Sequence, residues 1–209
     1  MPEWDSVLLF VGAGLLLNIT PGPDVLYIVG RSLGQGRVAG AVSALGIATG
    51  CLVHIAAGAL GLSALIVAAP VAYDAVRYAG AAYLAWLGFR ALVSRHDGLE
   101  VKSLTPVPLG RIYGQGIVTN VLNPKVALFF LAFLPQFTDP SRGSLPLQFV
   151  MLGLVFVING TLVCLGYALA ASWLGDWLKS RYAFSTWLNR AMGGLFIALG
   201  LRLAFDSRR

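Results

Sequence analysis

Two short motifs place charged side chains of opposite sign inside apolar stretches of the chain. Asp24 follows Thr20-Pro21-Gly22-Pro23 in a run from about Trp4 to Gly30, and Lys125 follows Asn123-Pro124 in a second run. A carboxylate can attract an ammonium group or take up a proton, and an ammonium group can hold a carboxylate. Side by side, the two would bind the head of a zwitterion. The predicted binding residues are therefore Thr20, Pro21, Gly22, Pro23, Asp24, Asn120, Asn123, Pro124 and Lys125.

The prolines in both motifs predict that a helix is broken there, because each removes a backbone donor and clashes with the preceding turn. Irregular backbone inside a membrane is tolerated only where protein buries it or where it lines a cavity. Each break leaves carbonyl groups at the end of one half-helix and amide groups at the start of the next. The amide end favours a negatively charged group. Two broken helices at corresponding positions of two halves indicate the central site of a transporter.

The same residues also have structural interpretations. Asp24 would stabilise the first turn of any helix, the stem of Lys125 could extend towards the membrane surface, and the two charges could pair with each other. Polar side chains near the breaks can hydrogen-bond the freed backbone groups instead of selecting a ligand. These side chains are Asn18, Thr20, Asn120 and Asn123.

His54 lies near the middle of a predicted span, and Asn159 occupies a similar place in the second half. An imidazole changes its charge near neutral pH, so we expect His54 to take part in proton coupling together with Asp24. The alternative is a packing role in which His54 hydrogen-bonds a neighbouring group.

The composition requires elements that cross a membrane. The chain has 209 residues, of which 57% are hydrophobic and 11% charged, and it contains 25 glycines. This predicts a polytopic membrane protein in a lipid bilayer. The net charge of +6 comes from Lys and Arg in short links, which argues against nucleic acid as a partner. The first segment lacks the features of a cleaved signal peptide. No Cys/His spacing resembles a metal site, and no cofactor is expected.

Spans of about 20 apolar residues predict six transmembrane helices, at 4–30, 38–69, 71–94, 109–135, 145–172 and 184–206. Aligning Asn18 with Asn120, an offset of 102, superimposes the two breaks. Residues 1–94 and 109–209 then form two three-helix repeats, joined by a cytoplasmic linker at 95–108. Because three is odd, the repeats must be inverted, which supplies two packings for alternating access. The excess of basic residues in the inner links places both termini outside.

Two other classes of function deserve comparison. Cys51 and Cys164, one in each half, could form a membrane thiol-redox relay. They lie away from the proline breaks, however, and their offset of 113 does not match the offset of 105 between His54 and Asn159. An uncoupled small-solute channel is the other alternative. The pairs Gly36/Gly40 and Gly46/Gly50 allow close helix contact, either within the chain or between two copies.

Several motifs in combination resemble the LysE/RhtB superfamily of bacterial amino-acid exporters. They are Thr20-Pro21-Gly22-Pro23-Asp24, Gly30-Arg31-Ser32-Leu33-Gly34-Gln35-Gly36-Arg37-Val38-Ala39-Gly40, Gly46 to Gly50 with His54, Tyr83-Leu84-Ala85-Trp86-Leu87-Gly88, and Gly116 through Asn123-Pro124-Lys125 to Phe137.

The resemblance implies a multi-pass protein of the bacterial inner membrane, not an enzyme. It also implies a homodimer that exports amino acids or related metabolites by exchange with protons, with both proline motifs at the core of the site. A dibasic substrate would require an additional buried carboxylate. Apart from Asp24, the nearest candidates lie in links or at span ends, namely Asp74, Asp139 and Asp176. We therefore expect a neutral substrate with a small or aliphatic side chain, and termini in the periplasm.

Overall fold

The computed structural model describes residues 4–62, 64, 68–93 and 105–180, together with seven single positions between 190 and 204. The predicted linker is therefore described only from Thr105, and the predicted sixth span lies almost entirely outside the described residues. The described part is all-helical and contains no strand. Its helices are α1 (Trp4–Ile19), α2 (Pro23–Ala57), η1 (Gly58–Leu62), α4 (Pro70–Val93), α5 (Leu109–Val121), α6 (Pro124–Leu128), η2 (Phe129–Phe133), η3 (Leu134–Phe137), η4 (Pro140–Arg142) and α7 (Leu145–Ser180).

Both predicted helix breaks are present. α1 ends at Ile19 and α5 at Val121, two positions separated by the offset of 102 that aligns Asn18 with Asn120. The following helices begin with Pro23 and Pro124, in the first turn, where the missing N–H has no helical partner to lose. The second break bends the chain by 46° between Leu109–Val121 and Pro124–Phe137.

The link predicted between the first two spans is much shorter than expected. Residues 31–35 and 37 are helical, and only Gly36 departs from helical geometry, with φ 82° and ψ 178°. Glycine adopts this positive φ at little cost because it has no Cβ. In a straight helix Ser32 and Gly40 would be about 12 Å apart, whereas here a Cβ at Gly40 would touch Ser32 Oγ. The chain therefore folds back at Gly36, so that α2 contributes to both predicted spans.

Two helical segments of the described part are long and apolar enough to cross a membrane: Pro23–Leu62, which contains the bend at Gly36, and Leu145–Ala171. A third crossing results if the two helical segments on either side of the second break, Leu109–Val121 and Pro124–Phe137, count as one span. The six-span arrangement thus remains a prediction.

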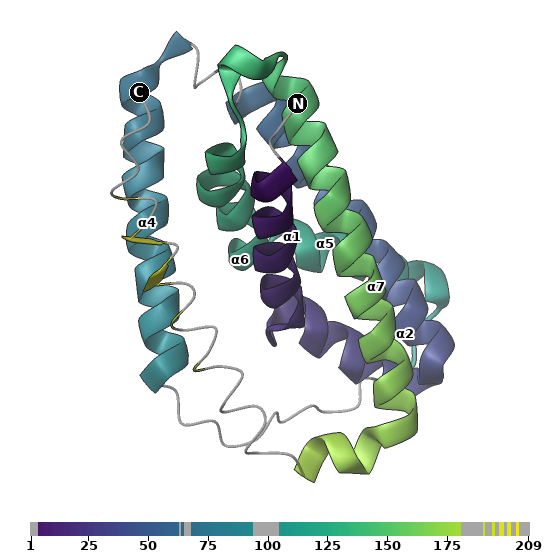
Figure 1. Ribbon diagram of the computed structural model, residues 1–209. Coiled ribbons are helices and arrows are strands. Elements are labelled where there is room, and N and C mark those ends of the chain that lie inside the picture. The colour runs from purple at the N-terminus through teal and green to yellow at the C-terminus, as the bar shows by residue number, and fades with distance from the viewer. Residues whose placement is uncertain are drawn as a thin grey trace.

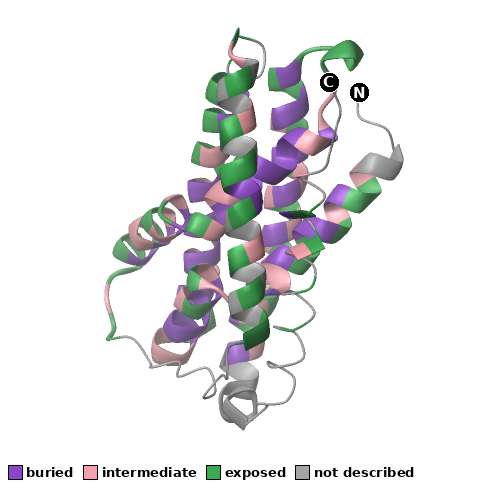
Figure 2. Cartoon of the chain, turned by 90° about the vertical axis from the view of Figure 1, so that its left-hand side faces the viewer, coloured by how far each residue is buried: buried purple, intermediate pink, exposed green. Residues whose placement is uncertain are grey.

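The outer surface carries large apolar side chains, such as Leu122 at 74% exposure and Leu162 at 67%, whereas buried residues run through the middle of the bundle (Figure 2). Such a surface is typical of contact with lipid.

α2 packs mainly against α5 and α7, and α1 packs against α7, while α4 stands to one side and contacts η2 (Figure 1). An aromatic core lies beside the middle of α1. Its buried rings include Phe10, Phe129, Phe133 and Phe156, and the Phe129 centroid lies 5.6, 4.9 and 4.8 Å from those of the other three. Contacts at these distances are favourable edge or offset arrangements. This core supports one wall of the cavity described below.

The glycines of α2 and α5 form an internal seam between the two halves of the chain. A Cβ at Gly46 would touch the carbonyl oxygen of Tyr113, and one at Gly116 would lie 2.9 Å from that of Ser43. A Cβ at Gly50 would lie 2.9 Å from the Cβ of Asn120. Backbones can approach this closely only where side chains are absent. The pair Gly46/Gly50 therefore packs within the chain, which decides between the two uses that the sequence allowed.

Candidate functional site

Side chains from the break itself and from α7 satisfy carbonyl groups at the end of α1. Thr20 Oγ1 donates to the carbonyl of Leu16 at 2.7 Å. Tyr167 Oη, from α7, donates to that of Ile19 at 2.6 Å. Thr20 therefore repairs the break, as one interpretation of the sequence predicted. Tyr167 was not identified from the sequence, because nothing in an apolar helix marks which tyrosine reaches a broken neighbour.

Lys125 crosses from the second half of the chain to the same helix end. Its Nζ donates to the carbonyl oxygens of Leu17 and Thr20, at 3.0 Å each. A cation is stabilised there by the partial negative charge of a helix C-terminus. A Cβ at Gly22 would lie 3.1 Å from Lys125 Nζ, so the missing side chain gives the ammonium group room. Lys125 was predicted to add its charge at an amide end. In this structure, however, it lies at a carbonyl end.

The second break is closed by its own residues. Asn123 Oδ1 accepts from the backbone N–H of Lys125 at 3.1 Å and thereby caps α6. The backbone N–H of Asn123 donates to the carbonyl of Asn120 at 2.9 Å. Asn123 thus serves the backbone, whereas the side chain of Asn120 does not.

Asn120 connects the two residues predicted to handle protons. Its Nδ2 donates to Asp24 Oδ2 at 2.8 Å, and its backbone carbonyl lies 3.1 Å from His54 Nε2. His54 also stacks on Phe130, with centroids 5.8 Å apart. Asp24 and Lys125, both in the described part, form no ion pair with each other, because each binds other groups. The direct pairing of the two charges that the sequence left open is therefore not made in this conformation.

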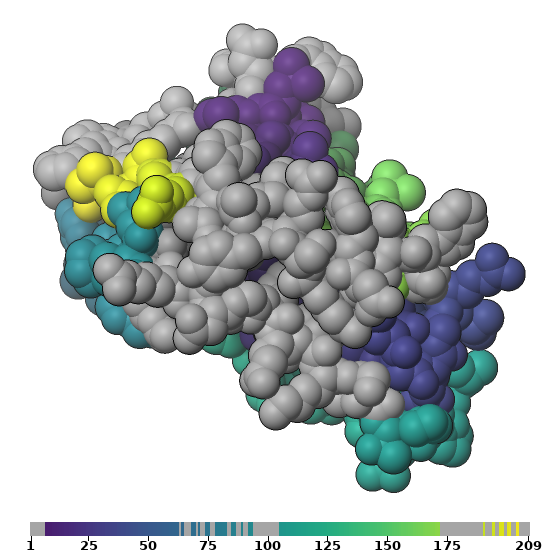
Figure 3. Space-filling model, turned by 90° about the horizontal axis from the view of Figure 1, so that it is seen from below, coloured from purple at the N-terminus to yellow at the C-terminus, as the bar shows by residue number. Residues whose placement is uncertain are grey.

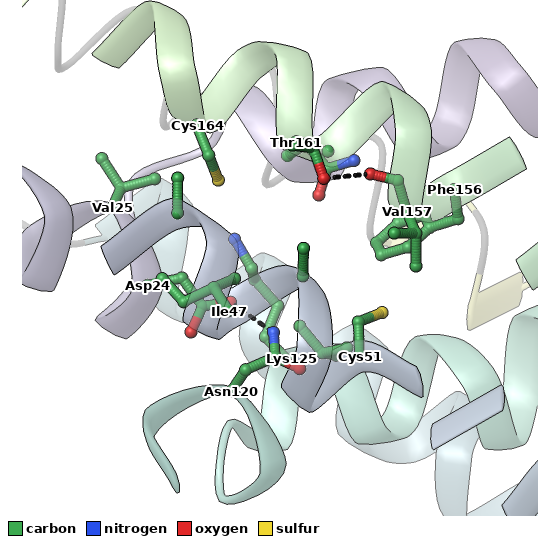
Figure 4. Close-up of a pocket in the computed structure, with 15 residues that line it drawn as sticks. Asp24, Val25, Ile47, Cys51, Asn120, Lys125, Phe156, Val157, Thr161 and Cys164 are labelled. Atoms are coloured by element: carbon green, nitrogen blue, oxygen red, sulfur yellow. Dashed lines mark hydrogen bonds between the residues drawn. The ribbon is translucent and has the colours of Figure 1, made fainter. Parts of the chain in front are cut away.

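A cavity of about 30 Å³ lies between the breaks and α7. Figure 4 shows Asp24, Asn120 and Lys125 on one side of it and Thr161 and Cys164 of α7 on the other. The volume suffices for one or two water molecules. The residues that line it are Asn18, Asp24, Val25, Ala44, Ile47, Ala48, Cys51, Asn120, Lys125, Val126, Phe156, Val157, Gly160, Thr161 and Cys164.

Three buried polar atoms of lining residues have no hydrogen-bond partner among the described residues: Asn18 Nδ2, Asp24 Oδ1 and Asn120 Oδ1. A buried polar atom without a partner is costly, so a group in the cavity that bonds to these atoms would gain affinity. The rest of the lining is mostly apolar. The site can therefore offer one carboxylate oxygen, one amide donor and one amide oxygen beside an apolar wall.

The structure brings only some of the predicted residues to the cavity. Asp24, Asn120 and Lys125 line it, whereas Thr20, Asn123 and the prolines shape the backbone at the breaks. His54 stands one hydrogen bond away, behind Asn120. No binding role was predicted for the α7 wall, although the polar residues Asn159 and Thr161 around Gly160, in an apolar stretch of the helix, were an available signal. Asn159 Nδ2 donates instead to the carbonyl of Val11, at 3.3 Å.

Cys51 and Cys164 both line the cavity, and both are buried free thiols. A redox relay needs two sulfurs at bonding distance and surroundings that stabilise a thiolate. The two cysteines form no disulfide, and most of their neighbours in the cavity wall are apolar. The structure thus lends the relay no support. Within the part of the chain that the structure describes, no three His, Cys, Asp or Glu side chains are grouped as a metal site would require.

Known proteins resemble this chain along almost its whole length. Residues 15–207 match the LysE type translocator family. The homoserine/homoserine lactone efflux protein of Salmonella typhi is 31% identical over 207 residues, which cover 97% of this chain and 96% of that protein. The leucine efflux protein of Salmonella choleraesuis is 28% identical over 195 residues, 93% of this chain and 92% of that protein. No solved structure gives a significant match. The chain therefore belongs to the LysE type translocator family and is a membrane translocator, not an enzyme.

Proposed function

We propose that this protein exports amino acids with neutral, small or aliphatic side chains, or related metabolites, by proton-coupled antiport with alternating access. Its relatives include a homoserine/homoserine lactone efflux protein and leucine efflux proteins. The observation that carries the proposal is the meeting of Asp24, Asn120 and Lys125 at one cavity between two broken helices. Broken helices facing a central cavity support this type of mechanism.

In the proposed binding mode, the unpaired Asp24 Oδ1 receives the ammonium group of the substrate. Lys125 leaves the carbonyl oxygens of Leu17 and Thr20 and binds the substrate carboxylate. Val25, Ile47 and Val157 provide an apolar wall for the side chain. Among the residues that line the cavity, Asp24 is the one carboxylate. This favours a neutral side chain over a dibasic one, because a second cation would lack a partner.

The cavity of about 30 Å³ is much smaller than an amino acid, so binding requires the helices around it to separate. The half that contains α1 and α2 meets the half that contains α5 and α6 at the glycine seam. Relative movement of the two halves at this seam would open the cavity to one side of the membrane at a time.

Coupling follows from competition for one carboxylate. A proton and the substrate ammonium both neutralise Asp24, so only one of them binds at a time. His54 is linked to Asp24 by the hydrogen bonds of Asn120 and would exchange protons with water when the site opens.

We further propose six spans in two inverted repeats, a homodimer, and insertion in the bacterial inner membrane with both termini periplasmic. The distribution of basic residues supports this orientation.

The test is transport by purified protein in proteoliposomes, with a panel of amino acids and an imposed pH gradient. Asp24→Asn keeps the shape and the contact with Asn120 but cannot be charged, so substrate flux driven by the pH gradient should be lost. Asp139→Asn is the matched control, because Asp139 caps a turn outside the cavity. Undiminished coupled flux in Asp24→Asn would remove Asp24 from the mechanism. Flux in the unmodified protein that does not respond to the pH gradient would favour the channel alternative.

A further inference from the structure

A row of polar side chains leads from the cavity along the first part of α2. Asp24, Tyr27, Arg31 and Gln35 are three or four residues apart and therefore share one helix face. Arg31 lies seven residues beyond Asp24, which corresponds to about 10 Å along the helix axis. The row ends next to Gly36, where the chain folds back.

This row faces α5, in the other half of the chain. Tyr27 Oη donates to the carbonyl of Ile112 at 2.8 Å, and Arg31 Nη2 donates to Gln115 Oε1 at 2.8 Å. Asp24 and Asn120 form the inner end of the same set of contacts. A polar seam therefore runs between the two halves, from the cavity outwards. Hydrogen bonds hold it closed, two of them between side chains and one from a side chain to the backbone.

Arg31 is an unusual member of this seam because it is a buried cation whose hydrogen-bond partners, among the residues that the structure describes, are all neutral. It is 5% exposed, and its Nη1 donates to Gln35 Oε1 at 3.0 Å and to the carbonyl of Thr105 at 2.8 Å. Its guanidinium also lies 5.6 Å from the ring centroid of Tyr27. Arg31 Nε has no hydrogen-bond partner in the described part of the chain. Burying a charge without an opposite charge is costly, and such residues in membrane proteins usually serve function.

At its outer end, the polar seam is hydrogen-bonded to the segment between the two halves, at Thr105 and Val107. Gln35 Nε2 donates to the carbonyl of Val107 at 2.8 Å, and Gln35 Oε1 accepts from the N–H of Val107 at 3.0 Å. Figure 3 shows this end of the molecule, where the blue surface of α2 and the teal surface of residues 105–113 lie side by side. The seam thus connects the cavity with the face that carries this segment, which is the cytoplasmic face in the proposed orientation.

We infer that the seam is the access path to the cavity from this face and that Arg31 is its anion contact, a substrate-binding residue outside the central site. When the halves separate, the guanidinium exchanges Gln115 for the carboxylate of an entering substrate, which its planar fork can bind through two hydrogen bonds. Neutral partners suit this role, because a carboxylate of the protein would compete with that of the substrate. The substrate part of this inference rests on the proposed function, whereas the path does not.

The path can be tested with the native cysteines, which line the cavity. In inside-out vesicles, Cys51 and Cys164 are labelled with anionic methanethiosulfonate ethylsulfonate or cationic methanethiosulfonate ethylammonium. Arg31→Gln should lower the ratio of anionic to cationic labelling rates about tenfold, the effect of one lost charge-assisted contact. Gln115→Leu, which removes the acceptor that holds the seam closed, should raise both rates severalfold.

The matched control is Arg37→Gln, because Arg37 is an exposed cation on the same helix. It should leave both rates unchanged, and Arg31→Lys should preserve the preference for the anion. An unchanged ratio in Arg31→Gln, or unchanged rates in Gln115→Leu, would overturn the inference. Labelling does not depend on which substrate the protein carries, so it decides the path even if the proposed function fails.

The substrate contact is tested by transport of homoserine and homoserine lactone into the same vesicles, since the lactone has no free carboxylate. Arg31→Gln should raise the KM for homoserine about tenfold and leave the KM for the lactone within about twofold. Equal changes for both compounds would contradict a carboxylate contact at Arg31. If the unmodified protein carries no amino acid or lactone, the proposed function fails, and the labelling ratio then decides the role of Arg31.

Discussion

Gly46 should tolerate a single added methyl group far less well than Gly114. A Cβ at Gly46 would touch the carbonyl oxygen of Tyr113 and lie 3.2 Å from Gly116 Cα, and both atoms belong to the backbone of α5. Backbone cannot rotate away, so α2 and α5 would have to separate. A Cβ at Gly114 would meet nothing within 4 Å. Both changes replace glycine by a better helix former, a gain of up to about 1 kcal/mol, but only Gly46→Ala also overfills a packed interface.

The steric cost of such overfilling is about 1–3 kcal/mol. Because the gain in helix propensity is common to both variants, they should differ in unfolding free energy by about this amount. For a chain of this length, 1 kcal/mol corresponds to a shift of about 2–4 °C in Tm. Gly46→Ala should therefore melt below Gly114→Ala by at least a few degrees.

The measurement is thermal unfolding in detergent, followed with a thiol-reactive fluorophore. The chain contains only two cysteines, and both are buried, so they react much faster once the protein unfolds than while it is folded. If Gly46→Ala melts as high as Gly114→Ala, α2 and α5 do not pack as closely as the structure shows. Asn120 would then not be held beside Asp24 either, since the same glycine contacts between α2 and α5 bring these two residues together.

Further variants at three sites test other contacts. His54→Ala and His54→Phe should both alter the pH dependence of transport, because neither can hydrogen-bond Asn120, whereas Phe keeps a ring on Phe130. If both leave the profile of initial flux against pH unchanged, His54 has only a packing role. Replacing Cys51 and Cys164 together by Ser should leave most of the transport activity in the proteoliposome assay, and its loss would reopen the redox relay. Tyr167→Phe removes the hydrogen bond to Ile19 and should lower stability by about 0.5–1.5 kcal/mol. Tyr113→Phe, which loses an exposed bond to Thr49, should melt closer to the unmodified protein in the same thermal assay.

Local chemistry accounts for most of what could be predicted from the sequence. Proline cannot continue a helix, so both breaks follow from residue type alone. The offset between the motifs also predicted that the helix ends at Ile19 and Val121 would correspond. The apolar composition indicated a membrane protein, and the combination of motifs indicated its family. A charge next to each break marked Asp24 and Lys125 as candidates for the site.

The partners of these residues depend on how distant segments pack, and no local rule gives them. The sequence placed Lys125 at the amide end of its own helix, but its long side chain reaches the carbonyl end of α1, more than 100 positions away in the chain. For Asn120 the sequence left open whether it binds ligand or repairs backbone; its side chain binds Asp24, because the Gly46–Gly116 contact brings α5 close enough to α2. The α7 wall and Arg31 likewise gain their roles only from neighbours that lie close in space. Residue type thus determined where the helices break, and close packing between glycines determined which side chains meet there.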